Sequence, residues 1–148
     1  MLGSLLLRLH RSFSRYSVFV VAATLGLAAL AKAIALPQLV ATLDGSMLMP
    51  PYLAMPAALI LVAWEVVLTF GLMLPVSRGG SLWCSAATLS GFIGFAVWRS
   101  VAGLPVPCSC FGPLFAAPPA ASAAICLALL LCVYTGLVQV PAFAVEST

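Results

Sequence analysis

Two cysteines separated by a single residue are the clearest chemical feature of this sequence. Cys108 and Cys110 lie in the segment Arg99–Pro119, RSVAGLPVPCSCFGPLFAAPP, which holds five of the eleven prolines. Thiols this close can form a disulfide when the backbone turns between them, although so small a ring departs from relaxed geometry. A strained, accessible disulfide is more oxidising than a structural one. The pair therefore predicts thiol–disulfide exchange. The alternative is that both thiols simply pack as small hydrophobic groups.

The other three cysteines are expected to be packing residues. Cys126 and Cys132 are six positions apart, which places them on different faces of a helix and prevents them from pairing with each other. Cys84 has no cysteine near it in the sequence. In a membrane, an isolated cysteine usually behaves as a small hydrophobic side chain.

Copper binding is a second interpretation of the Cys108–Cys110 pair. Thiolate and thioether sulfurs suit Cu(I), and Met47, Met49 and Met55 lie in or beside the segment DGSMLMPPYLAMP. Methionine at a membrane interface more often fills gaps, and the one histidine comes before the first apolar run. We therefore predict no metal site and keep Cu(I) handling as a minor alternative.

Two charged residues lie inside apolar runs. Lys32 is about one turn from the end of the first run, and Glu65 is near the middle of the second. A charge at the centre of a membrane helix costs about 2.5 to 3.5 kcal/mol on insertion scales, so such residues pair or line a polar cavity. At 1.5 Å per residue, Glu65 lies roughly 20 Å deep and Lys32 only about 6 Å, which does not assure direct contact.

Two roles for this lysine and glutamate stay open. One is structural, either as an ion pair that joins two helices or as a lysine that extends toward the membrane surface. The other is functional, because an ammonium beside a thiol favours the reactive thiolate.

The composition places these residues in a membrane protein. Of the 148 residues, 64% are hydrophobic and 6% are charged, with a mean hydropathy of +1.23, whereas soluble domains carry about 25% charged residues. These values exclude a water-soluble domain and a disordered chain. Five cysteines in 148 residues are too few for a disulfide-stapled miniprotein. Three of the six basic residues, Arg8, Arg11 and Arg15, precede the first apolar run. That pattern marks a cytoplasmic end and not a nucleic-acid-binding face.

Four apolar runs predict an all-α integral membrane four-helix bundle, formed by a single transmembrane domain over residues 1–148. Spanning about 30 Å of hydrocarbon takes about 20 helical residues, and we expect helices at about 17–36, 52–74, 81–98 and 120–140. Prolines mark several of the limits, namely Pro37, Pro75, Pro118, Pro119 and Pro141. The first run exceeds the core of a signal peptide, about 7 to 15 residues, so we expect a retained helix.

The arginines predict the orientation. With the N-terminus in the cytoplasm, Arg99 alone lies outside, and the arginines inside are Arg8, Arg11, Arg15 and Arg78. This N-in, C-in topology sends Pro37–Pro51 and Arg99–Pro119 outward. The Cys-containing loop before the last helix then faces an oxidising compartment, where close thiols form redox couples. Because the loop is largely apolar, we expect it to fold down on the bundle.

Several of these residues together resemble the MauE family of DoxX-like membrane proteins. The matching features are Lys32 late in the first helix, Trp64 and Glu65 in the second, and the C-x-C-F-G string at Cys108–Gly112. The resemblance covers roughly Leu25 to Leu131. It implies assistance with thiol and disulfide chemistry outside the cytoplasmic membrane, alongside a thioredoxin-like partner. In methylamine utilisation, the companion enzyme has a disulfide-rich subunit.

The four-helix layout is also similar to that of DsbB and vitamin K epoxide reductase enzymes. Those proteins carry C-x-x-C and further paired cysteines, and this chain lacks a second external pair. The missing pair speaks against a quinone cofactor, which stays an open alternative, and no other cofactor is predicted.

These observations lead to one expected function and one alternative. We expect a multi-pass protein of the bacterial cytoplasmic (inner) membrane that exchanges disulfides with a periplasmic thioredoxin-like protein and so supports the maturation of exported proteins. Cys108 is the expected attacking thiol, Cys110 the resolving thiol, and Lys32 and Glu65 complete the site. The expected partners are the periplasmic thioredoxin-like protein and the lipid bilayer, and no nucleic acid is expected. The alternative is a non-catalytic scaffold or assembly factor whose C-x-C is a structural clip.

Overall fold

Helices make up the architecture of the chain. The structure is a computed structural model that describes residues 2–45, 49–103 and 119–138. Within these ranges the elements are α1 (Leu2–Ile34), α2 (Leu36–Asp44), α3 (Pro51–Met73), α4 (Arg78–Val101) and α5 (Pro119–Leu137). Four stretches are long and apolar enough to cross a membrane, namely Tyr16–Ile34, Pro51–Met73, Arg78–Val101 and Ala120–Leu137. The prediction of an all-α fold with four long apolar helices is therefore confirmed for the residues that the structure describes.

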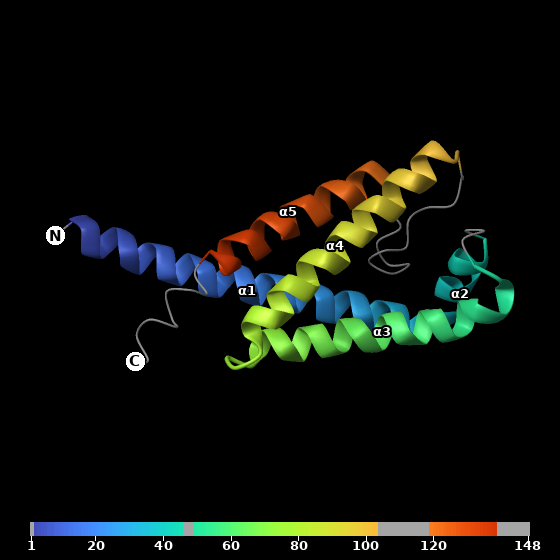
Figure 1. The fold of residues 1–148 in the computed structure, drawn as a ribbon, viewed down its shortest axis with the longest axis horizontal. Helices are drawn as coiled ribbons and strands as arrows, with labels where there is room; N and C mark the ends of the chain where they lie inside the picture. The colour runs from blue at the N-terminus through green and yellow to red at the C-terminus, as the bar shows by residue number, and fades with distance from the viewer. Residues whose placement is uncertain (1, 46–48, 104–118, 139–148) are drawn as a thin grey trace.

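The four long helices alternate in direction along the chain and form a bundle (Figure 1). α1 and α4 each pack against both α3 and α5, while α2 packs against α3. α1 and α4 end, and α3 and α5 begin, at the same end of this bundle. We call it the Lys32 end, because Lys32 lies in the last turn of α1. The turn between α3 and α4 lies at the opposite end.

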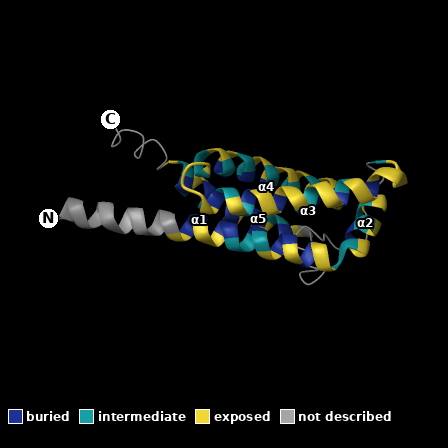
Figure 2. Cartoon of the chain, turned by 90° about the horizontal axis from the view of Figure 1, so that it is seen from below, coloured by how far each residue is buried: buried dark blue, intermediate teal, exposed yellow. Residues whose placement is uncertain are grey.

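Small and branched aliphatic side chains form the core between these helices. On α1, buried residues recur three or four positions apart, at Val18, Val21, Ala22, Leu25 and Ala28, which is the spacing of one helix face. In Figure 2 the buried positions line the inside of the bundle and the exposed positions face outward. The outward faces carry large apolar side chains, among them Phe19, Ile60, Val67 and Phe70. Such a surface suits hydrocarbon and not water.

The first membrane helix ends earlier than predicted, and a further helix follows it. α1 ends at Ile34, and the backbone turns at Ala35 with φ −108° and ψ 37°. Pro37 lacks the N–H that would continue the hydrogen-bond ladder of α1. It is accepted instead in the first turn of α2, where no such donor is needed. From the sequence, this stretch was expected to be a loop.

Several other helix limits also differ from the expected ones, including the start of α4, which is at Arg78 and not near residue 81. α1 begins at Leu2 and not near residue 17, because a helix can continue beyond the apolar part that crosses a membrane. α4 runs to Val101, past the expected limit near residue 98. Arg99, expected to begin the outer loop, therefore lies in the last turn of α4.

Candidate functional site

Two of the four predicted site residues lie in the described part of the chain. Lys32 is on α1 and Glu65 is on α3. Cys108 and Cys110 lie outside the described residues. The geometry of the candidate site is therefore built from the lysine, the glutamate and the side chains around them.

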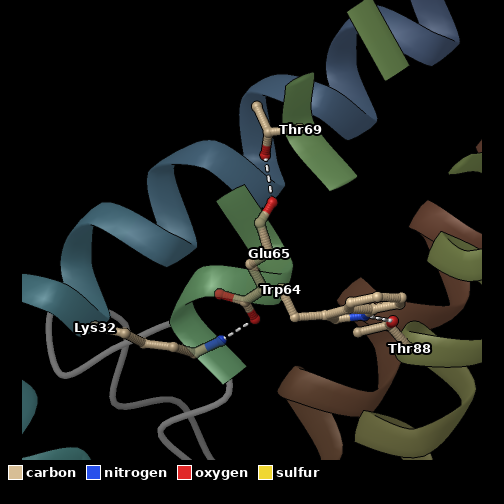
Figure 3. A network of polar contacts seen from close by, with 5 residues as sticks. All are labelled: Lys32, Trp64, Glu65, Thr69 and Thr88. Atoms are coloured by element: carbon tan, nitrogen blue, oxygen red, sulfur yellow. Dashed lines mark hydrogen bonds and ion pairs between the residues drawn. The ribbon is translucent and has the colours of Figure 1, made fainter. Parts of the chain in front are cut away.

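The structure brings Lys32 and Glu65 into direct contact. Lys32 Nζ donates a hydrogen bond to Glu65 Oε1 (Figure 3). The two side chains are 1% and 0% exposed, respectively. Both charges are therefore removed from water and lipid together, as an ion pair across the interface between α1 and α3.

The contact is made although the two residues are at different distances from their helix ends. α2 occupies the chain between α1 and α3, so α3 begins beyond the end of α1 (Figure 1). The depth estimate assumed that both helices end at the same level, and for that reason it underestimated how closely the two side chains approach. Gly26, which precedes Lys32 on α1, lies against Thr69, which follows Glu65 on α3. A Cβ on this glycine would be 3.2 Å from Thr69 Cγ2. The close approach of the helices at this glycine supports the same antiparallel register.

Aromatic and hydroxyl groups surround the ion pair. Lys32 Nζ lies 4.7 Å from the centre of the Phe92 ring of α4, within the range of a cation–π contact. Thr69 Oγ1 donates a 2.8 Å hydrogen bond to the backbone oxygen of Glu65, one turn before it. Glu65 Oε2 is buried and accepts no hydrogen bond from any described residue. The pair is thus held by three helices, with one carboxylate oxygen not engaged by those residues.

Trp64 connects the same region of α3 to α4. Its Nε1 donates a 3.0 Å hydrogen bond to Thr88 Oγ1 (Figure 3), and Thr88 donates in turn to the backbone oxygen of Cys84 at 2.9 Å. Adjacent residues of α3 therefore face two different helices, since Glu65 faces α1 and Trp64 faces α4.

A second buried cation, which the sequence analysis did not place in the site, lies at the Lys32 end. Arg99 is 3% exposed, and its guanidinium carbon is 5.7 Å from the centre of the Phe95 ring. Phe95 also stacks on Trp98, with ring centres 6.2 Å apart. The sequence does carry a signal for this arrangement, because an arginine four positions after a phenylalanine lies over it on a helix.

A cavity of about 180 Å³ opens beside the ion pair. Four helices contribute to its walls, through Lys32, Leu39, Thr42, Leu43, Leu61, Phe92 and Phe95. Three of these seven residues belong to α2. Sequence reasoning missed the cavity because it did not predict α2.

The three remaining cysteines pack as expected. Cys126 is part of the core, and Cys84 and Cys132 are half-buried against it. Within the described ranges, no group of three or more His, Cys, Asp or Glu side chains could hold a metal ion. Of the methionines considered as soft ligands, Met47 lies outside the described residues, and Met55 is 47% exposed on α3.

Comparison with known protein families identifies a match. A family model described as "Methylamine utilisation protein MauE" matches residues 10–140, which is most of the chain. This range contains the ion pair, the cavity and the C-x-C string. No curated protein and no solved structure matches the chain.

Proposed function

This chain belongs to the MauE family, and from that premise we propose that it is a membrane thiol–disulfide exchange protein. Cys108 and Cys110 are its redox pair, and its partner is a thioredoxin-like protein outside the bacterial cytoplasmic membrane. In this proposal both chain termini face the cytoplasm. The exchange supports disulfide formation or maturation in exported proteins.

The observation that carries the proposal is the location of the buried ion pair. Residues 104–118, which include the two cysteines, connect the end of α4 to the start of α5. Both of these helix ends are at the Lys32 end of the bundle (Figure 1). The ion pair and the cavity lie toward the same end, because Lys32 is in the last turn of α1, contacts Glu65 and lines the cavity. The costly charged groups and the attachment points of the cysteine segment therefore share one end of the molecule. Intramembrane charges commonly mark functional sites.

The proposed exchange proceeds in two thiol–disulfide steps. The Cys108 thiolate attacks one sulfur of the partner's disulfide, so that a mixed disulfide forms and the partner's other sulfur leaves as a thiolate. The Cys110 thiolate then attacks Cys108 Sγ, which closes the Cys108–Cys110 disulfide and releases the second partner thiolate. The partner gains two electrons and this protein loses two, while the released thiolates take up protons. The reverse sequence oxidises the partner.

We assign Lys32 and Glu65 a role in positioning and in electrostatics. Their contact fixes α1 against α3 beneath the helix ends that carry the cysteine segment. An ammonium near a thiol favours the thiolate, and the carboxylate of the pair offsets part of that effect. The proposal is therefore that the pair tunes the reactivity of the cysteines while holding the bundle in register.

Trapping of the mixed disulfide tests the proposal. In the Cys110→Ser variant, the first step can occur and the second cannot, so a covalent complex with a thioredoxin-like protein should accumulate on non-reducing gels. Cys84→Ser is the matched control, since Cys84 packs against the core of the bundle, and it should behave like the wild type. If Cys110→Ser and Cys108→Ser both accumulate no complex while the wild type still exchanges disulfides, the assignment of these cysteines is wrong.

A non-catalytic scaffold is the second candidate function, and the complete burial of the ion pair favours it. Lys32 and Glu65 join two helices without any exposed surface, which is what a purely structural pair would do. The reduction potential of the Cys108–Cys110 couple distinguishes the two functions. A structural disulfide should titrate below about −300 mV, and an exchange couple should titrate above that value.

A further inference from the structure

The short helix α2 forms one wall of the cavity at the Lys32 end. Leu39, Thr42 and Leu43 line the cavity, and residues with this spacing share one face of a helix. Leu39 is buried. The chain turns at Ala35 before the helix and at Gly45 after it. α2 is therefore folded back so that a single face closes over the space between α1, α3 and α4.

The lining residues present almost only apolar surface to this space. Lys32 Nζ is directed toward Glu65 Oε1, to which it donates a hydrogen bond. Thr42 Oγ1 donates to the backbone oxygen of Gln38 at 2.8 Å. A buried water needs about two to four polar partners, and the surface that the described lining residues turn toward the space is almost wholly apolar. The cavity therefore favours an apolar occupant over water.

The other walls define the shape of that occupant. Leu61 of α3 and the rings of Phe92 and Phe95 of α4 complete the described lining. An apolar cavity of about 150 Å³ lined by Leu, Ile and Phe stays dry and binds benzene. The cavity in this chain has a volume of about 180 Å³, which is enough for one six-membered ring.

We propose that this cavity is a binding site for a single uncharged apolar ring, carried by a molecule dissolved in the bilayer. The Phe92 and Phe95 rings favour an aromatic or flat ring over a flexible alkyl chain, because aromatic groups stack or meet edge to face. A ring bound here adjoins Phe92, which is also the ring beneath the Lys32 ammonium. The occupant would therefore contact the surroundings of the ion pair directly. This binding goes beyond the proposed exchange and requires neither cysteine.

Titration of the purified protein in nanodiscs with fluorobenzene, followed by ¹⁹F NMR, tests the proposal. The wild type should show saturable binding above the partitioning measured in empty nanodiscs. Leu61→Phe places extra volume in the cavity and should weaken binding at least tenfold. The matched control is Leu59→Phe, the same substitution at a residue of α3 that is 48% exposed. This variant should keep the affinity within twofold.

Two further measurements keep the test decisive. If Leu61→Phe does not insert, Leu39→Phe fills the same cavity from α2 and should weaken binding in the same way. The Cys108→Ser/Cys110→Ser double variant should bind fluorobenzene like the wild type, so that a failure of ring binding and a failure of disulfide exchange are separate results. Equal binding by Leu61→Phe and Leu59→Phe overturns the site. Displacement of fluorobenzene by a lower concentration of decane shows that a lipid acyl chain is the occupant and overturns the assignment of a ring.

Discussion

Each member of the Lys32–Glu65 pair depends on the other for its charge to be tolerated. Both side chains are buried between α1 and α3, where neither water nor lipid headgroups can solvate them. Removing one partner of a buried pair leaves an uncompensated charge and costs about 3 to 5 kcal/mol, whereas replacing both partners is often close to neutral. The geometry therefore predicts strong coupling between the two positions.

A double-mutant cycle measures this coupling. Lys32→Met and Glu65→Gln should each lower the free energy of unfolding by about 3 to 5 kcal/mol, and the double variant should lose clearly less than the sum of the two. Reversible unfolding in mixed detergent is a suitable measurement. Additive losses would mean that the two side chains do not act as a pair in the membrane.

The same double variant tests whether the pair also affects the cysteines. If the pair is only structural, the Lys32→Met/Glu65→Gln protein should alkylate at Cys108 and Cys110 with an unchanged dependence of rate on pH. If Lys32 favours the thiolate, the rate at neutral pH should fall and its midpoint should move to higher pH.

At the level of single residues, the sequence predicted which charges matter but not how they meet. Placing a charged side chain in hydrocarbon costs free energy, and this cost identified Lys32 and Glu65 as special positions without any structure. Their contact depends on how far α3 extends beyond the end of α1, and this offset comes from α2. Burial of Arg99 was missed for a related reason, because an arginine near an expected helix limit was counted as a loop residue.

Among the helices, α3 and α4 pack tightly where Gly71 faces Ser81. A Cβ built on Gly71 would lie 2.2 Å from Ser81 Oγ and 3.2 Å from Ser81 Cβ. This contact lies next to the turn between the two helices, where Ser77 Oγ also donates to the backbone oxygen of Gly71 at 3.0 Å. The glycine therefore permits the tight end of the helix pair.

Gly71→Ala should lower stability by about 1 to 3 kcal/mol, the usual cost of inserting volume into a packed contact. Gly91→Ala on the neighbouring helix is the control, since nothing lies within 4 Å of a Cβ there; it should leave stability unchanged or raise it slightly. Adding Ser81→Ala to Gly71→Ala should restore part of the loss, because the closest atom is removed. Thermal unfolding of the wild type and these three variants measures the effects.

Hydropathy predicted the long helices because a span must satisfy its backbone hydrogen bonds within itself and present apolar side chains to lipid. Those requirements do not apply to α2, which has nine residues and a proline in its first turn. Its sequence resembles a loop, and it is helical because Leu39 is buried against the bundle. Tertiary contact, which a single sequence does not display, decided this element and with it the cavity.

For the molecule as a whole, the unequal distribution of arginines predicts the orientation in the membrane. In a variant without native cysteines, a cysteine at Asp44 of α2 reports on the Lys32 end, and a cysteine at Val76, which is 99% exposed in the turn before α4, reports on the other end. A membrane-impermeant thiol reagent added from outside should label Asp44→Cys in intact cells and Val76→Cys only after permeabilisation. The opposite pattern would invert the topology.

α1 has a further practical consequence. It is a continuous helix of 33 residues, about 50 Å long at 1.5 Å per residue, and only its part from Tyr16 to Ile34 belongs to a candidate span. The preceding turns extend past the other helices (Figure 1). A soluble domain joined to Leu2 through an unbroken helical linker would keep a constant orientation relative to the bundle. Such a fusion would give this 15.3 kDa chain a rigid marker for particle alignment in electron cryomicroscopy.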